Sequence, residues 1–276
     1  MKIFNINCSI DNYKFSKFKK KTNLCLGFFD GVHLGHKLLI KKAKAENDNV
    51  AIVTFDNFKK KCLTTVEERL FFFKKMNINC VFIFDFKKIK DVPYDIFKKS
   101  FLDVINLNSI FIGNDFKFGK NRLGKANYLK KFFIIKTVSF LKKNNKKISS
   151  SEIKKIVKHG DIKTANQLLG YNFCIFGNVI KKNKKDLFVS AQKDKILPPS
   201  GDYKMSICSV KSSNKKNIIA KNLNLCFKFF KNSKNIIIIL TLNDNFSLLK
   251  KINLKMQIII ELIDKNNNYS MTSYGF

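Results

Sequence analysis

The stretch GFFDGVHLGHKLL, residues 27–39, contains two of the three histidines in the chain, His33 and His36. A short apolar run precedes it, and the pattern that follows predicts a helix. A strand, a glycine-rich turn and a helix start would gather backbone N–H groups, the positive end of a helix and two imidazoles around one point. This predicts a phosphate site, with both rings on one side of the first helical turn. The alternative is a helix cap with two incidental histidines.

The elements that would position this motif follow an alternating pattern through residue 171. Short apolar runs are separated by longer helical patterns, which predicts right-handed βαβ units and a Rossmann-like, doubly wound parallel sheet in an α/β fold. Ligands of such sheets bind beyond the carboxyl ends of the strands. The predicted strands are 24–29, 50–55, 80–86 and 109–112, and the predicted helices are 34–45, 66–76, 94–106, 125–133, 150–158 and 162–169.

After Tyr171 the pattern changes to short β-rich runs separated by Asn, Lys, Ser and Gly clusters. This predicts a smaller antiparallel barrel or sandwich, with one helix at about 246–252. We therefore expect two domains, 1–171 and 172–276. The predicted strands of the second domain are 173–180, 187–191, 203–210, 224–230, 235–242 and 256–263.

The chain is strongly basic, with 54 Lys and Arg against 20 Asp and Glu and a net charge of +34. Such a surface attracts anions, whether nucleic acid, anionic lipid or small phosphorylated molecules. The lysine blocks are spread along the whole chain, for example at 17–21, 57–61, 142–147 and 181–185. This spread favours an ordinary solvated surface over a dedicated nucleic-acid site.

The seven cysteines are odd in number, widely spaced and never arranged as C-x-x-C. This argues against a disulfide framework and against a zinc site, and it favours a reducing environment. We see no signal peptide, and the apolar run 236–242 is too short to span a bilayer. We therefore expect a soluble, cytoplasmic protein with no membrane partner; the sequence does not predict its oligomeric state.

Four motifs in order resemble those of the prokaryotic FAD synthases, the bifunctional riboflavin kinase/FMN adenylyltransferases. Their amino-terminal module belongs to the HxGH nucleotidyltransferase superfamily. The resemblance covers nearly all of residues 20–171. The motifs are GFFDGVHLGH (27–36), LTTVEERLFFFKKMNINCVFIFDF (63–86), IFIGNDFKFGKNRLG (110–124) and ISSSEIKKIVKHGDIKTANQLLG (148–170).

The resemblance implies adenylyl transfer, in which the phosphate of FMN attacks the α-phosphorus of ATP. The products are FAD and pyrophosphate, Mg²⁺ is required, and no covalent enzyme intermediate forms. By the same resemblance, the catalytic residues His33 and His36 would hold ATP phosphates and stabilise the transition state. The other ATP-binding residues would be Gly27, Phe28, Asp30, Gly35, Ser149, Ser150, Ser151 and Lys154.

The third motif implies the flavin side of the site. No metal-ligating residue is assigned. The flavin-binding residues would be Gly113, Asn114, Asp115, Phe116, Phe118, Gly119, Asn121 and Arg122.

The chain departs from the family pattern at two places. The family usually has TFxPHP after its second strand, whereas Asn57, Phe58 and Lys59 stand here in place of the Pro, His and Pro. The ISSTxIR motif has Ser151 for its Thr and Lys154 for its Arg, which keeps the charge but loses the bidentate fork. We interpret these changes as drift in an active enzyme; a catalytically dead relative is the alternative.

The segment GKNRLGKA, 119–126, has the spacing of a Walker A loop. It fails as one because Ala126 stands where a Ser or Thr would hold Mg²⁺. Gly119 and Gly124 belong to the flavin loop in this interpretation, and for Gly124 an ordinary turn is an equal alternative.

The carboxyl-terminal domain resembles the riboflavin kinase barrel at 171–180 and 196–207 but lacks the signature between them. The family carries Gly-Phe-Pro-Thr-Ala-Asn there, whose Thr and Asn serve Mg-ATP, whereas residues 181–195 read KKNKKDLFVSAQKDK. Beyond residue 171 the only Glu is Glu261, so a base is also lacking. We expect a degenerate barrel; the alternative is a bifunctional enzyme with diverged kinase residues.

Two further hypotheses compete with FMN adenylyl transfer. One is another HxGH transferase, with pantetheine phosphate, nicotinate mononucleotide or glycerol phosphate as acceptor, which the GNDFKFGKNR segment disfavours. The other is a basic nucleic-acid-binding protein on a dead nucleotidyltransferase fold, which predicts lysines clustered on one face and salt-dependent affinity.

Overall fold

The computed structural model describes residues 1–6, 20–56, 61–143, 145–210, 216–231, 235–242, 249 and 251–265. Asn57, Phe58 and Lys59 lie outside the described residues, as does most of the helix predicted at 246–252. The chain divides into two compact units. The first contains residues 1–60 and 69–148, and the second contains residues 61–68 and 149–276.

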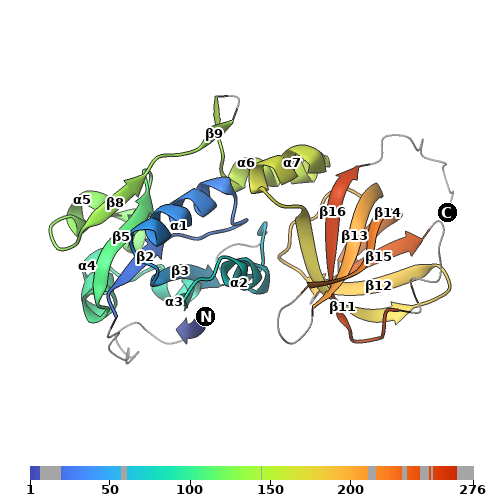
Figure 1. Cartoon of the computed structure of the whole chain (residues 1–276), viewed down its shortest axis with the longest axis horizontal. Helices are drawn as coiled ribbons and strands as arrows, with labels where there is room; N and C mark the ends of the chain where they lie inside the picture. Colours follow the sequence, from blue (N-terminus) through green and yellow to red (C-terminus); the bar gives the residue numbers. More distant parts are fainter. Residues whose placement is uncertain are drawn as a thin grey trace. The chain divides into compact units, whose positions relative to one another are not determined.

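The first unit is built on a six-stranded sheet in which every pair of neighbouring strands is parallel (Figure 1). Its strands, in spatial order, are β1 (Lys2–Ile6), β4 (Cys80–Asp85), β3 (Val50–Asp56), β2 (Thr22–Leu26), β5 (Leu107–Gly113) and β8 (Ile135–Val138). The chain runs outward from β2 through β3 to β4, then returns to β5 on the other side of β2. The strand order therefore reverses between β2 and β5, where a doubly wound sheet has its ligand crevice.

Helices and short segments connect these strands. Helix α1 packs against β2, β3 and β5 and buries Leu39, Ile40 and Ala43. The helices are α1 (Leu34–Glu46), α2 (Val66–Lys75), α3 (Phe86–Ile89), α4 (Tyr94–Ser100) and α5 (Ala126–Leu129), with 3₁₀ segments η2 (Leu102–Val104) and η3 (Lys120–Arg122). Two small ladders pair β6 (Lys117–Phe118) with β7 (Gly124–Lys125) and β9 (Lys142–Lys143) with β10 (Lys146–Lys147).

The described part of the second unit contains two whole helices, the first turn of α2 and a closed antiparallel barrel (Figure 1). Along β12 the side chains of Leu187, Val189 and Ala191 are buried in alternation, as expected when one face of a strand lines a core. The elements are α6 (Ser150–His159), α7 (Ile162–Leu169), β11 (Phe173–Lys182), β12 (Asp186–Gln192), β13 (Gly201–Val210), β14 (Lys216–Lys231), β15 (Asn235–Leu242) and β16 (Gln257–Lys265). The barrel order is β11, β12, β15, β14, β13 and β16, and β16 pairs with β11.

These units divide the chain differently from the boundary predicted near residue 172, because α6 and α7 fall in the second unit. Asn166 of α7 explains this. Its Nδ2 donates to the carbonyls of Leu262 and Ile263 in β16, each at 3.0 Å, and its Oδ1 accepts from the backbone N–H of Phe173 at 2.6 Å. A single amide thus fastens α7 to two strands of the barrel.

The predicted fold class is confirmed, with a parallel sheet followed by an antiparallel barrel. Two predicted helices are shorter than expected. The helix predicted at 94–106 ends at Ser100, because Phe101 leaves helical geometry with φ −124°, and 3₁₀ segment η2 follows. The helix predicted at 125–133 is the single turn α5. No helix among the described residues is long and apolar enough to cross a membrane.

Candidate active site

The turn between β2 and α1, residues 27–33, is held in an unusual backbone conformation. We call it the histidine turn. Phe29 has φ 53°, Gly31 has φ 86° and Val32 has φ 36°, and the N–H of Val32 donates to the carbonyl of Phe29 at 3.1 Å. A positive φ is rare for an aromatic residue and strained for a β-branched one. Strain of this kind persists only where the surroundings enforce it, and it gathers at functional sites.

Two buried side chains enforce the geometry by binding the carbonyl of Phe28. Thr54 of β3 donates its hydroxyl to that oxygen at 2.9 Å, and Nη1 of Arg69 donates to it at 3.2 Å. Nη2 of Arg69 also donates to the carbonyl of Phe55 at 2.7 Å. The guanidinium therefore joins the histidine turn to the end of β3. Neither Thr54 nor Arg69 was among the predicted site residues.

A signal for Arg69 was nevertheless present in the sequence. Among 54 basic residues only two, Arg69 and Arg122, are arginines. A planar fork that donates to two acceptors at once cannot be replaced by a lysine. In a chain this rich in lysine, a retained arginine indicates a position where that fork is used.

His33 and His36 lie face to face at the start of α1. His33 is the N-cap residue, and its Nδ1 accepts from the backbone N–H of His36 at 3.4 Å. The two rings are stacked, with centroids 3.7 Å apart and planes 16° apart. A Cβ on Gly35 would come within 3.2 Å of the His33 ring, so glycine leaves the room that this ring occupies. Because Nδ1 of His33 is an acceptor, its proton is on Nε2 when the ring is neutral.

Burial keeps both imidazoles neutral at neutral pH. It lowers the pKa of His33 from its ordinary value of 6.5 to about 4, against the opposing charge of Asp30 and with a smaller contribution from Lys147. The pKa of His36 is also lowered well below 6.5 by burial, with His33 and Arg69 acting in the same direction. Nδ1 of His36 is buried and has no hydrogen-bond partner among the described residues. A bound anion would oppose this lowering, because its negative charge favours the protonated imidazoles.

Stability should therefore fall with acidity between pH 6.5 and 4. In that range the unfolded chain binds a proton at His33 that the folded chain does not, so the free energy of unfolding rises with pH. From pH 6.5 to pH 5 the expected loss at His33 is about 1.6 kcal/mol. Urea unfolding at the two pH values measures it. The variant His33→Asn keeps a capping acceptor and should lose this part of the pH dependence; an unchanged dependence would contradict the assignment.

The predicted flavin loop, residues 113–122, follows β5, on the other side of the strand-order reversal from the histidine turn. Phe116 and Phe118 are stacked, with ring centroids 5.6 Å apart. Tyr94 meets Phe118 edge-on at 6.3 Å and Tyr128 at 4.7 Å. The structure thus builds an aromatic cluster at this loop, and sequence analysis had missed Tyr94 and Tyr128.

Glycine is required in this loop by a close approach. Gly119 has φ +70°, and a Cβ on it would lie 2.7 Å from the backbone of Tyr94. A Cβ on Gly124 would lie 2.6 Å from Cβ of Tyr94, so Gly124 is more than an ordinary turn residue. Asn121 and Arg122 also have positive φ, and both are exposed, as are Asn114 and Asp115.

Lys147 lies close to both predicted halves of the site, although the sequence did not single it out. Its Nζ pairs with Asp115 of the flavin loop at 2.7 Å and lies over the Phe140 ring at 3.3 Å from the centroid. The positive charge of Lys147 also lowers the pKa of His33. Among the predicted flavin residues, Asp115 is therefore already paired with a cation.

The serine motif lies in the second unit. Ser149 caps α6, with its hydroxyl accepting from the N–H of Glu152 at 3.3 Å, and Ser150 and Ser151 form the first turn. Lys154 donates to the carbonyl of Lys61 at 3.0 Å. The predicted N-terminal amides and hydroxyls are thus present on α6. That they meet the phosphates held by His33 and His36 stays a prediction.

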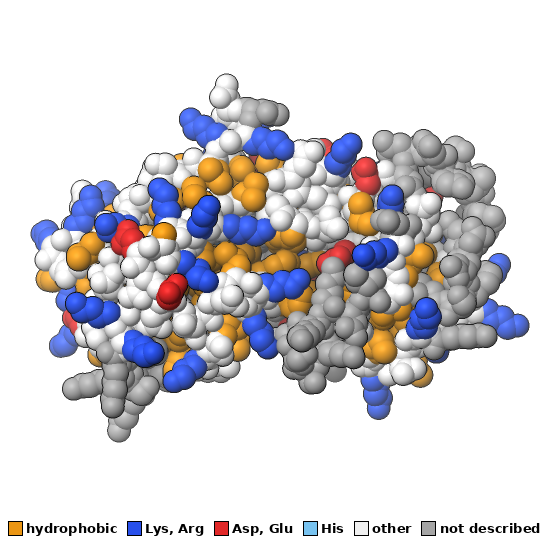
Figure 2. All heavy atoms as spheres, in the orientation of Figure 1, with side chains coloured by type: hydrophobic (Ala, Val, Ile, Leu, Met, Phe, Trp, Pro, Cys, Tyr) orange, Lys and Arg blue, Asp and Glu red, His pale blue; other side chains and the backbone are white. Residues whose placement is uncertain are grey.

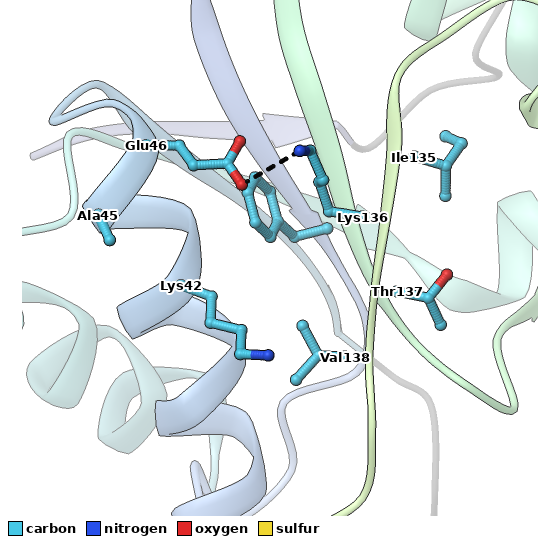
Figure 3. Close-up of a pocket in the computed structure, with 8 residues that line it drawn as sticks. Lys42, Ala45, Glu46, Ile135, Lys136, Thr137 and Val138 are labelled. Atoms are coloured by element: carbon cyan, nitrogen blue, oxygen red, sulfur yellow. Dashed lines mark ion pairs between the residues drawn. The ribbon is translucent and has the colours of Figure 1, made fainter.

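A surface cavity of about 370 Å³ lies elsewhere in the first unit, between the carboxyl-terminal half of α1 and β8 (Figure 3). Lys136 of β8 pairs with Glu46 of α1 at 3.5 Å at its rim. None of its lining residues belongs to the histidine turn or to the flavin loop. The cavity therefore does not bear on the candidate site.

Comparison with known proteins supports the sequence resemblance. The family model described as FAD synthetase matches residues 15–152, half of the chain. A Listeria monocytogenes protein named bifunctional riboflavin kinase/FMN adenylyltransferase is 29% identical over 206 residues, which cover 65% of this chain and 66% of that protein. The match thus spans just under two thirds of that relative. A second L. monocytogenes protein, named FAD synthetase, is 26% identical over 222 residues, covering 74% of this chain and 88% of its own length.

A solved structure shares the fold. It is described as a macrolide-efflux protein from Streptococcus pneumoniae, and it superposes with a TM-score of 0.76 at 17% identity, covering 99% of this chain and 94% of that one. At this identity the likeness concerns architecture alone. The combination of a parallel sheet with a following antiparallel barrel therefore occurs in an experimentally determined structure.

Proposed function

This chain belongs to the FAD synthetase family, and on that premise we propose that it transfers the adenylyl group of ATP to FMN. A phosphate oxygen of FMN attacks the α-phosphorus, the bond from that phosphorus to the bridging oxygen breaks, and pyrophosphate leaves with FAD as product. The observation that carries the proposal is the strained histidine turn, which stacks two neutral imidazoles at the start of α1 beside the strand-order reversal.

The histidines supply donors without a covalent step. His33 presents Nε2–H to a phosphate oxygen, and the first amides of α1 add the partial positive charge of a helix start. As negative charge builds on the departing pyrophosphate, a neutral imidazole donor strengthens its hydrogen bond. The FMN phosphate is already anionic near neutral pH, so it needs no general base.

Mg²⁺ is proposed to arrive as part of the ATP substrate. No group of three or more His, Cys, Asp or Glu able to hold a metal occurs in the described ranges of the chain. Mg²⁺ commonly binds through substrate phosphates and waters with few protein ligands, so this residue set fits a metal carried by ATP. Asp30 is the buried carboxylate in the histidine turn and would be the protein anion available to such a metal there.

The remaining assignments are proposals of the same kind. Residues 1–171 are proposed to form the adenylyltransferase domain and 172–276 a riboflavin-kinase-like barrel, in a cytoplasmic protein whose partners are ATP, FMN, FAD and pyrophosphate. The nucleic-acid alternative predicted lysines clustered on one face. On the face drawn in Figure 2, Lys and Arg side chains are spread out and form no continuous stripe.

The test is incubation of the purified protein with FMN and Mg-ATP, with chromatographic measurement of FAD and pyrophosphate in equal amounts. An ATP analogue with a methylene group between the α- and β-phosphorus cannot release pyrophosphate and is the matched control. Pantetheine phosphate, nicotinate mononucleotide and glycerol phosphate are tested as acceptors in parallel. Turnover of one of these in place of FMN would overturn the proposal, and so would the absence of FAD.

The flavin assignment predicts a selective effect of Gly119→Ala. The new Cβ meets the backbone of Tyr94 and is placed at φ +70°, so the loop must shift. We expect KM for FMN to rise roughly tenfold while KM for ATP changes less than about twofold. Gly160→Ala is the control, because Gly160 also has a positive φ but its Cβ would have ordinary contacts, the nearest at 3.5 Å. Equal changes in both KM values would remove the loop from flavin binding.

A further inference from the structure

The strongest feature that the proposed mechanism does not use is a buried ion pair in the second unit. Nζ of Lys195 lies 2.6 Å from Oε2 of Glu68, and their side chains are 1% and 0% exposed. Nζ also donates to the carbonyl of Leu63 at 2.5 Å and lies 4.6 Å from the centroid of the Phe173 ring. Lysine and glutamate are almost never fully buried unless they are paired, so this pair is a built feature.

Glu68 uses the rest of its acceptors on two different segments. Its Oε2 accepts from the backbone N–H of Thr65 at 2.9 Å, and the N–H of Glu68 donates to the Thr65 hydroxyl at 3.2 Å, which forms a capping box at the start of α2. Its Oε1 accepts from the backbone N–H of Phe176 in β11 at 3.0 Å. One carboxylate therefore fastens the first turn of α2 to a barrel strand and to Lys195.

The backbone before α2 is also paired with the loop that carries Lys195. The N–H of Cys62 donates to the carbonyl of Asp194 at 2.7 Å, and the N–H of Ile196 donates to the carbonyl of Cys62 at 2.9 Å. These contacts explain why residues 61–68 belong to the same compact unit as the barrel. We call this set of contacts the α2 clamp.

The residue after Glu68 is Arg69, the side chain that holds the carbonyls of Phe28 and Phe55. Both residues lie in one continuous helix, Val66–Lys75. A rotation or a shift of the first turn of α2 would therefore move the guanidinium away from the carbonyl of Phe28. Such movement would relax the strained conformation that places His33 and His36.

We propose that Glu68 and Lys195 are positioning residues for adenylyl transfer: through Arg69 they fix the histidine turn. The inference rests on the proposed function for its activity readout only. It also gives the barrel a role without kinase chemistry, because the barrel supplies Lys195 and the Phe176 amide. Buried ion pairs add little net stability compared with apolar replacements, so a role in fixing one geometry accounts for this one better than stability does.

The test compares Lys195→Met with Lys182→Met. Lys182 is a control lysine in the same barrel, since its Nζ donates to the carbonyls of Leu249 and Ile252 at 2.9 and 2.7 Å, and both acceptors lie outside α2. Hydrogen–deuterium exchange is measured for peptides covering residues 27–37. We expect exchange there to be roughly tenfold faster in Lys195→Met and unchanged in Lys182→Met. Equal exchange in the two variants would overturn the proposal.

Glu68→Gln is made in parallel, because Lys195→Met leaves a buried carboxylate unpaired and can prevent folding. Glutamine keeps a carbonyl acceptor for one backbone donor and removes the charge that holds Lys195. Glu68→Gln should also speed hydrogen exchange in residues 27–37. Exchange as slow as in the wild type would contradict the proposal that the α2 clamp fixes the histidine turn.

Turnover gives the second readout, at a temperature where every variant is folded. We expect Lys195→Met to lower kcat about tenfold, with KM for FMN and ATP changed less than about twofold. In a protein that already carries Arg69→Lys, Lys195→Met should lower kcat by less than a further twofold. The reason is that the hydrogen bonds of Arg69 that connect α2 to the histidine turn are already lost. Full multiplication of the two effects would contradict the route through Arg69. If the wild-type protein makes no FAD, the proposed function is wrong. The hydrogen exchange of residues 27–37 would still show whether the α2 clamp holds the histidine turn.

Discussion

Replacement of His36 by alanine is expected to slow FAD formation by roughly 10²- to 10³-fold at saturating ATP and FMN, the effect of removing one transition-state donor. The imidazole is stacked on His33 at 3.7 Å and lies 5.0 Å from the Phe29 ring, in the turn proposed to hold the phosphates. Initial rates measured by chromatography test this. His159→Ala is the control, because the third histidine is exposed on α6 and should leave the rate within about twofold.

Loss of the ring could also disturb its neighbour, so a second measurement separates the two effects. Thermal unfolding reports the structural part, and addition of free imidazole to His36→Ala reports the chemical part, since a ring that occupies the vacated space should restore part of the rate. Turnover equal to that of the wild type would remove His36 from the mechanism. A raised KM for ATP with an unchanged kcat would limit it to ground-state binding.

Local patterns predicted most of the elements, and the failures have a common cause. Helix α1 was predicted within one residue because its apolar spacing and its cap are local features. The two strands of the six-stranded sheet that were missed, β1 and β8, both lie at its edges and are only partly buried. An edge strand is stabilised by pairing with one neighbouring strand. A short polar sequence such as IKTV does not show that this pairing occurs, so the strand was not predicted.

The candidate site divides in the same way. The histidines and Gly35 are adjacent in sequence, so their spacing carried the signal. Thr54, Arg69 and Lys147 reach the site from β3, α2 and β10, and their roles depend on which strand lies beside which. For Arg69, which lies within the motif 63–86, the scarcity of arginine was a further indication.

The barrel gives the other prediction with a large effect: riboflavin and Mg-ATP should yield no FMN. Kinase chemistry in this family would need a Thr and an Asn to hold Mg-ATP, and Asn183 and Thr241 of the described barrel are both bound to other groups. Oδ1 of Asn183 accepts from the amides of Lys185 and Asp186 in the β11–β12 turn. The hydroxyl of Thr241 donates to Asp186 at 2.7 Å. Asn183 thus serves the turn, and Thr241 of β15 bonds its cross-strand partner in β12.

The only glutamate beyond residue 171, Glu261, is also poorly suited to act as the base. Glu261 lies within β16, opposite Cys174 and Ser206 in the neighbouring strands, and not on a loop that could close over a substrate. The protein should therefore convert FMN to FAD and leave riboflavin unchanged. Addition of a separate riboflavin kinase to the same mixture should restore FAD formation from riboflavin, which shows that the assay is competent. FMN formed by the protein alone would mean that diverged residues perform the phosphoryl transfer, since neither the metal-holding pair nor the base of the family is present in its usual form.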